Sequence, residues 1–215
     1  MRVFGDPSIE QELADFFTYE YPGARFTPQF KARLWDGKVR LYDQLRKTIY
    51  IGLLQYVEKF CERNDYLLTY KQDPFTGNGI THESIETFVK ALELPEKIEI
   101  RDYQIDAIQK ALNEERTLLL SPTGSGKSFI IYSIMRAHVA EGRKCVLIVP
   151  TTSLVEQMYS DFQDYSTVNR WSVDNHCQKL YSGFPKEFTK DVLITTWQSI
   201  YLQPKSWFKQ FNVIF

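Results

Sequence analysis

The chain has 215 residues, 43% of them hydrophobic and 15% aromatic, which is typical of a globular protein and not of a disordered one. A formal net charge of −1 excludes a general attraction to nucleic acid, so any basic surface must be local. The longest strongly apolar run, Cys145 to Val149, is far too short to cross a bilayer, and the first residues show no signal peptide. Three widely spaced cysteines indicate reduced thiols in a cytosolic compartment.

The first 95 residues predict a small α/β domain. Helical spacing of apolar residues predicts helices over residues 9–17, 52–65 and 85–92. Between the first two helices, Asp36-Gly37 is the signature of a tight hairpin turn, and apolar residues on either side of it predict short strands.

After Leu94-Pro95 the pattern changes to short apolar strands that alternate with helices. Continuously apolar strands indicate a parallel sheet that helices cover on both faces. We therefore expect a second domain over residues 96–215. Its expected strands are residues 117–121, 144–150, 178–182, 191–196 and 211–215, and its expected helices are residues 102–115, 127–140 and 152–165.

A glycine-rich loop, SPTGSGKS at residues 121–128, stands between an expected strand and an expected helix. It matches the pattern G-x-x-x-x-G-K-[ST] except that Ser121 replaces the first glycine. Glycines let several backbone N–H groups point at one anion, and the following helix adds the positive end of its dipole. Lys127 would reach the β- and γ-phosphates of a nucleoside triphosphate, and Ser128 would hold Mg²⁺. The alternative is a Gly/Ser loop with a solvated lysine.

Four segments in this order resemble the superfamily 2 helicases. Residues 121–128 are similar to motif I of that family, in which a small residue followed by Pro-Thr replaces the first glycine. Residues 100–108 (IRDYQIDAI) resemble its adenine-reading segment. Residues 146–158 (VLIVPTTSLVEQM) resemble motif Ia, and residues 193–200 (LITTWQSI) resemble motif Ib.

This resemblance implies a partial RecA-like sheet of the P-loop NTPase type, with ATP and Mg²⁺ as cofactors and Lys127 as the catalytic residue. The amide of Gln104 can pair with both a donor and an acceptor on adenine. Thr151 and Thr196 become candidate contacts to the backbone of the tracked strand, although a simple helix N-cap is the alternative for such a threonine. The candidate nucleotide-binding residues are Gln104, Pro122, Thr123, Gly124, Ser125, Gly126, Lys127 and Ser128.

Residues 14–20, 25–30, 34–43 and 51–61 resemble the front domain of phage recombination helicases, and residues 195–211 resemble their approach to motif II. The resemblance implies an ATP-driven motor that remodels branched or double-stranded DNA in the cytoplasm of a phage-infected bacterium. Recombination or replication proteins are expected partners. In these helicases the strand similar to residues 211–215 runs into motif II, whose carboxylates hold Mg²⁺ and position water. Because the chain ends first, we expect it to hydrolyse ATP slowly or not at all by itself.

A basic window over residues 25–47 is the second candidate site. It contains seven basic and two acidic residues, with aromatic residues interleaved. This pattern favours a grip on DNA phosphates with an aromatic wedge at a branch point, and Lys31, Arg33 and Lys38 are the candidate contacts. The alternative is a solvated strand face above an aromatic core.

Two rival functions remain open at this level. The motor subunit of a restriction enzyme would share the motor motifs but not the front-domain similarity. Alternatively, the chain is a binding module whose front domain docks DNA or a recombination protein, while its ATPase half is inert.

Overall fold

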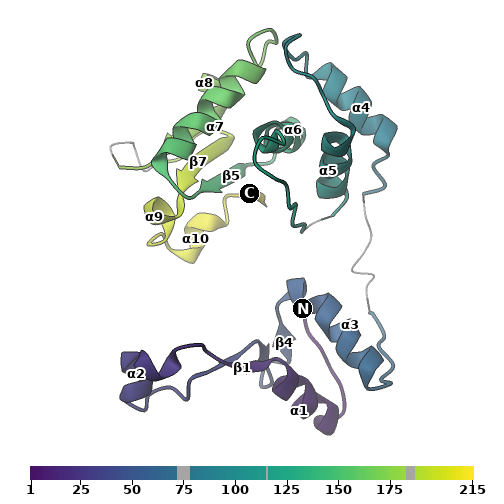
Figure 1. Cartoon of the computed structure of the whole chain (residues 1–215), viewed down its shortest axis with the longest axis vertical. Coiled ribbons are helices and arrows are strands. Elements are labelled where there is room, and N and C mark those ends of the chain that lie inside the picture. Colours follow the sequence, from purple (N-terminus) through teal and green to yellow (C-terminus); the bar gives the residue numbers. More distant parts are fainter. Residues whose placement is uncertain (72–77, 115, 183–186) are drawn as a thin grey trace. The chain divides into compact units, whose positions relative to one another are not determined.

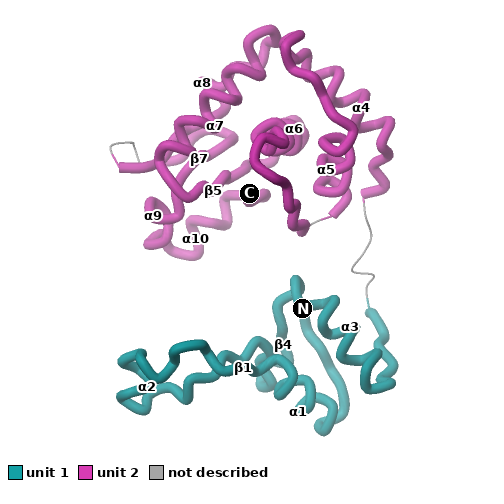
Figure 2. Tube along the Cα trace, viewed as in Figure 1, with its two compact units in different colours: residues 1–74 teal, residues 75–215 magenta. Residues whose placement is uncertain are grey.

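The computed structural model describes residues 1–71, 78–114, 116–182 and 187–215, and it confirms the α/β class. The chain divides into two compact units, Met1–Pro74 and Phe75–Phe215 (Figures 1 and 2). This division differs from the expected boundary near residue 95. The reason is that helix α4 (His82–Ala91) packs on α5 (Asp102–Asn113) in one apolar cluster that includes Ile85 and Ile108.

Unit 1 forms around one apolar cluster between its first and last helices. Leu13, Ile49, Val57 and Phe60 are each at most 4% exposed in this cluster, and their removal from water stabilises the unit. The elements of unit 1 are α1 (Pro7–Phe16), β1 (Thr18–Glu20), η1 (Ala24–Phe26), α2 (Pro28–Lys31), β2 (Lys38–Arg40), β3 (Tyr42–Asp43), β4 (Thr48–Ile49), η2 (Ile51–Leu53) and α3 (Leu54–Arg63).

The prediction of a tight hairpin at Asp36-Gly37 is wrong. Strand β2 pairs in antiparallel fashion with β1, from Thr18 opposite Arg40 to Glu20 opposite Lys38, so its partner lies far upstream. Residues 21–37 form a long connection between the two strands, which we call the 21–37 arm. It contains η1 and α2, and Figure 1 shows it extending away from α1 and α3. Gly37 is its one buried residue, so the arm takes almost no part in the core.

Unit 2 contains a parallel sheet with the strand order β6-β7-β5-β8. Successive side chains of a strand point to opposite faces. Accordingly, Leu147 and Ile194 pack against α6 and α7 on one face, while Val146 and Leu193 pack with Ile200 on the other. The strands are β5 (Cys145–Val149), β6 (Cys177–Leu180), β7 (Val192–Thr196) and β8 (Val213–Ile214).

The remaining helices of unit 2 pack on the two faces of this sheet. Within the described residues, no helix is long and apolar enough to span a membrane. Besides α4 and α5, the helices are α6 (Lys127–Ala140), α7 (Thr152–Tyr165), α8 (Val173–His176), α9 (Trp197–Ile200) and α10 (Lys205–Phe208).

The strand expected at residues 117–121 does not form. Leu118 and Leu120 are 80% and 88% exposed, and only Leu119 packs partly against the cluster of α4, α5 and α6. An apolar run indicates a tendency to be buried, but a strand also needs a hydrogen-bonded partner. No described strand pairs with this segment.

Candidate functional site

The glycine-rich loop of residues 121–126 leads directly into α6. Gly124 and Gly126 have φ angles of +81° and +77°, left-handed values that favour glycine at both turns. A Cβ atom at position 126 would lie 2.3 Å from Gln104 Nε2, whereas one at position 124 would meet nothing within 4 Å. The loop is therefore closely packed at Gly126 and open at Gly124.

The first turn of α6 presents backbone N–H groups that can bind an anion. Gly126 is the N-cap residue, and no side chain among the described residues caps the helix. The carbonyl of Gly126 accepts the N–H groups of Phe129 and Ile130, at 3.0 and 3.2 Å. Within the described chain the N–H groups of residues 126–128 meet no acceptor. Free N–H groups at the positive end of a helix dipole are suited to a phosphate.

Lys127 is bonded to the glycine-rich loop itself. Its Nζ donates to the carbonyl oxygens of Ser121 and Pro122, at 3.1 and 2.7 Å. The Pro122 carbonyl also accepts the hydroxyl of Ser125 at 2.8 Å, while the side chain of Thr123 is exposed. A phosphate oxygen can replace the two carbonyls as the partner of this ammonium group, because the lysine is itself exposed.

The hydroxyl of Ser128 lies 2.8 Å from the hydroxyl of Tyr165. Burial raises the pKa of Tyr165, so its phenol stays protonated at neutral pH and can donate to Ser128. In the described ranges, no group of three His, Cys, Asp or Glu residues could hold a metal ion.

Gln104 connects the start of α5 to the loop and is 5% exposed. Its Oε1 accepts the backbone N–H of Arg101 at 3.0 Å, and its Nε2 donates to the carbonyl of Ser125 at 3.0 Å. The Tyr103 hydroxyl donates to the same carbonyl at 2.9 Å. A cavity of about 310 Å³ opens beside these residues, with Phe129 in its wall. The segment predicted to read adenine and the glycine-rich loop thus line one cavity.

The two threonines predicted to contact DNA differ in exposure. Thr151 follows β5, and Thr196 is the last residue of β7. The two strands are parallel neighbours, and Val149 of β5 lies opposite Thr196. Thr151 is exposed, and its hydroxyl caps α7 by accepting the N–H of Leu154 at 3.3 Å. Thr196 is 3% exposed, and its hydroxyl lies 2.8 Å from that of Ser199. Only the side chain of Thr151 is open to a phosphate.

The structure brings together two of the three basic residues predicted in unit 1. Lys31 and Arg33 line a hollow on the 21–37 arm, whereas Lys38 begins β2 outside that hollow. The aromatic residues of the arm are not core residues, since Phe26 is 70% exposed and Phe30 is 37% exposed. The alternative of a solvated strand face above an aromatic core is therefore wrong for the 21–37 arm, whereas Tyr42, the last aromatic residue of the basic window, is 3% exposed in the core of unit 1.

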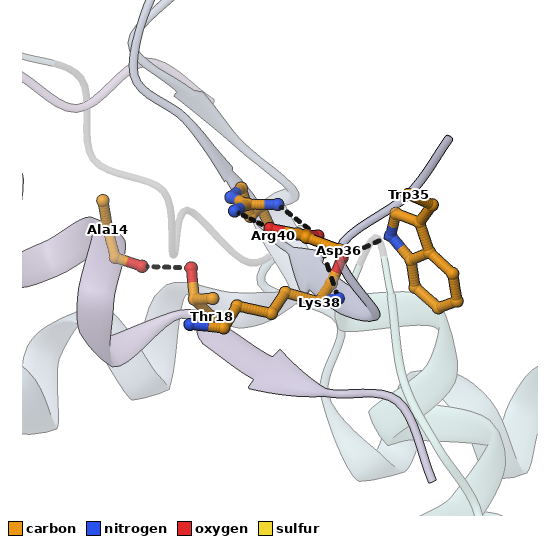
Figure 3. Close-up of polar contacts among 6 residues, drawn as sticks. All are labelled: Ala14, Thr18, Trp35, Asp36, Lys38 and Arg40. Atoms are coloured by element: carbon orange, nitrogen blue, oxygen red, sulfur yellow. Dashed lines mark hydrogen bonds and ion pairs between the residues drawn. The ribbon is translucent and has the colours of Figure 1, made fainter. Parts of the chain in front are cut away.

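Asp36 orders the base of the arm (Figure 3). Its carboxylate accepts the backbone N–H of Lys38 at 3.1 Å and forms an ion pair with Arg40. The hydrogen bonds from Arg40 lower the pKa of Asp36 to about 2, with a smaller contribution from Lys38. Trp35 Nε1 donates to the carbonyl of Lys38 at 2.8 Å, which fixes the position of the indole.

Three residues of these sites escaped the sequence analysis. Tyr103 adjoins Gln104 in the same motif, and this adjacency was the available signal. Arg25 lines the hollow of the arm and belongs to the basic window that composition identified. Tyr165 gave no signal, because its contact with Ser128 joins residues 37 positions apart.

Comparisons with known proteins match both units. The family model described as "Type III restriction enzyme, res subunit" matches residues 97–214, and the model "DNA helicase UvsW, N-terminal" matches residues 1–71. The "ATP-dependent DNA helicase uvsW" of Enterobacteria phage T4 is 33% identical over 223 residues, covering 100% of this chain and 43% of that protein. The "DNA 3'-5' translocase XPB2" of Sulfurisphaera tokodaii is 34% identical over 86 residues, or 37% of this chain and 18% of that protein.

Solved structures give the same result. A crystal structure of T4 UvsW superimposes with a TM-score of 0.87 at 32% identity, covering 99% of this chain and 44% of the other. A second one, of the UvsW helicase from bacteriophage T4, gives 0.86 at 32% identity over 99% of this chain and 77% of the other. The chain thus spans less than half the length of the curated T4 relative. The chain belongs to the family described as the res subunit of type III restriction enzymes, and its first 71 residues match the N-terminal domain of the DNA helicase UvsW.

Proposed function

We propose that the protein acts as an ATP-dependent DNA helicase or translocase that remodels branched DNA in recombination and repair. The observation that carries this proposal is the loop at residues 121–128, with two left-handed glycines, N–H groups at the start of α6 that meet no described acceptor, and an exposed lysine bonded to two of its carbonyls. The name of the T4 relative, an ATP-dependent DNA helicase, supports the same function.

In this proposal the loop binds the phosphates of ATP. The N–H groups of residues 126–128 hold phosphate oxygens, and the ammonium of Lys127 exchanges its two carbonyl partners for the β- and γ-phosphates. Ser128 would hold Mg²⁺, which neutralises charge that develops on the transferred phosphate. The cavity beside Gln104 would receive the adenine, and the Gln104 amide would exchange its bonds to Arg101 and Ser125 for bonds to the base.

DNA contact is assigned to both units. Thr151, at the carboxyl end of β5, would hold a phosphate of the tracked strand, together with backbone N–H groups near Thr196. Lys31, Arg33 and Lys38 would hold phosphates of the branched DNA through unit 1. The function of a restriction-enzyme motor subunit would use the same loop, but the match of residues 1–71 to a helicase model favours the helicase function.

Nucleotide binding is tested by titrating the 215-residue chain with a fluorescent ATP analogue and Mg²⁺. We expect Lys127→Ala to weaken binding at least about tenfold, because a hydrogen-bonded charge on the phosphates is lost. The matched control Lys205→Ala removes an exposed lysine from α10 and should leave the affinity unchanged. Equal affinities for all three chains would contradict the assignment of the loop.

DNA binding by unit 1 is tested separately with forked DNA at several salt concentrations. We expect Lys31→Glu/Arg33→Glu to weaken binding and to reduce the slope of log K against log salt by roughly 0.9 for each lost phosphate contact. The double variant Lys59→Glu/Arg63→Glu makes the same charge change on exposed residues of α3. If both double variants weaken binding equally, the effect is one of net charge and the assignment fails.

A further inference from the structure

The hollow on the 21–37 arm is lined by a mixture of basic and aromatic side chains. Its volume is about 590 Å³, which lies within the range of about 300–1,000 Å³ usual for small-ligand sites. Its wall combines three basic residues with three apolar or aromatic ones. They are Arg25, Lys31 and Arg33, and Phe30, Leu34 and Trp35.

The apolar part of this wall stays partly exposed, although the ring of Trp35 packs on that of Tyr21 with 5.8 Å between the centroids. Neither η1 nor α2 contains a buried residue, and Leu34 is 82% exposed. Phe30 lies against Gly37, where a Cβ atom would come within 3.0 Å of its ring. The ring therefore has a fixed seat on one side and stays 37% exposed.

The positive charge of the hollow is not compensated. Its one carboxylate, that of Asp36, is paired with Arg40, which does not line the hollow. Within the described chain, Arg25, Lys31 and Arg33 form no ion pair. Three cations without a described ion-pair partner, of which Arg25 lies over the ring of Phe26 at 5.1 Å from its centroid, attract an anionic ligand.

Local hydrogen bonds give the hollow a defined shape. The hydroxyl of Thr27 caps α2 by accepting the N–H of Phe30 at 3.3 Å. The indole of Trp35 is tied to the Lys38 carbonyl, and Figure 3 shows its six-membered ring turned away from that bond. The two aromatic side chains are thus held from different elements, α2 and the residues that precede β2.

We infer that this hollow binds one unpaired nucleotide of branched DNA. Its base stacks on the ring of Phe30 or Trp35, and its flanking phosphates pair with Arg25, Lys31 and Arg33. A base inside an intact duplex cannot enter, because both of its faces are covered by neighbouring base pairs. The inference rests on the proposed DNA function of unit 1 and adds to it a means of distinguishing branch points from plain duplex.

The test compares two DNA duplexes that differ by one unpaired nucleotide. One duplex is fully paired, and the other carries a single extra 2-aminopurine, whose fluorescence is quenched when it stacks. We expect the 215-residue chain to bind the second at least about fivefold more tightly, with a change in quenching. Phe30→Leu keeps an apolar side chain but removes the ring, and it should abolish this preference and the change in quenching.

Matched controls separate stacking from damage to the fold. Tyr50→Leu removes another exposed ring of unit 1, outside the hollow, and should keep the preference. Lys31→Gln does not alter a ring and should reduce the salt slope on the bulged duplex by about one, whereas Lys59→Gln on α3 should not.

Equal affinity of the wild-type chain for the two duplexes would overturn the inference while leaving duplex binding, and the proposed function, in place. An equal loss of affinity for both duplexes in Phe30→Leu would also overturn it. The same holds if an acidic, aromatic peptide displaces the bulged duplex at lower concentration than single-stranded DNA does. Failure to bind either duplex would overturn the DNA-binding role of unit 1 as well, and nucleotide titration of Lys127→Ala then judges the loop separately.

Discussion

The two candidate sites are built on opposite principles. In unit 2 the glycine-rich loop enters a helix whose Ile130, Tyr132 and Met135 are at most 4% exposed, so the loop takes its geometry from the core. In unit 1 the hollow lies on an arm with one buried residue and takes its geometry from a few hydrogen bonds. Substitutions should therefore affect stability strongly near the first site and binding specificity near the second.

The largest expected effect is a loss of stability, and it tests the contrast between the two units most directly. Phe162→Ala removes a ring that is 0% exposed and packs on Tyr132, with 5.4 Å between the ring centroids. This substitution should lower the free energy of unfolding by about 3–5 kcal/mol. Phe26→Ala removes a ring that is 70% exposed and should change it by at most about 0.5 kcal/mol. Urea unfolding followed by circular dichroism measures both, and similar losses would show that the arm is a structural element.

The next effect concerns the two glycines of the loop. Gly126→Ala imposes a left-handed alanine and pushes Gln104 away from Arg101 and Ser125, so we expect a loss of about 3 kcal/mol in unfolding free energy. Gly124→Ala imposes only the backbone strain, about 1 kcal/mol, because its Cβ atom meets open space. Thermal and urea unfolding of the two variants should rank them in this order, and the reverse order would contradict the described packing of Gly126.

A smaller effect is expected at the base of the arm. Asp36→Asn removes the one carboxylate in the wall of the hollow and frees Arg40, so affinity for forked DNA should rise roughly two- to threefold at low salt. Asp43→Asn is the matched control, because it releases Arg46 outside the hollow. An equal rise in both variants would attribute the effect to net charge.

The smallest effect is a pH dependence in unit 2. Burial lowers the pKa of His138 below 6.5, and Arg143 lowers it further, while Glu141 opposes them. The unfolded chain then binds this proton more readily than the folded one, so stability is full above the unfolded pKa of about 6.5 and declines as pH falls through it. His138→Gln should flatten the melting temperature between pH 7 and 5, with His82→Gln as a control for loss of an exposed imidazole.

Regular packing was predictable from sequence, and nonlocal pairing was not. The apolar runs at residues 145–149 and 192–196 became strands because both faces of the sheet are covered, and a continuous run records that directly. Residues 117–121 have a similar run, but a run does not show which strand will pair with it. In the same way, the turn signal at Asp36-Gly37 located the left-handed Gly37 but could not reveal that β2 pairs with β1.

The candidate sites divide along the same line. The local pattern of glycines, lysine and serine predicted the loop and the start of α6, because those features need only neighbouring residues. The bond from Gln104 to Ser125 and that from Ser128 to Tyr165 join positions 21 and 37 residues apart, and a single sequence carries no record of them. The hollow of the arm likewise depends on how α2 folds back towards Gly37.

The bond between Gln104 and Ser125 makes α5 a reporter of the loop. Any ligand that rotates the Ser125 carbonyl must either break this bond or move the first turn of α5, which also packs on α4 and α6. Amide hydrogen exchange in the first turn of α5 should then respond to nucleotide before exchange in the strands does. One buried amide thereby converts occupancy of a surface loop into a movement, or a loosening, of a neighbouring helix.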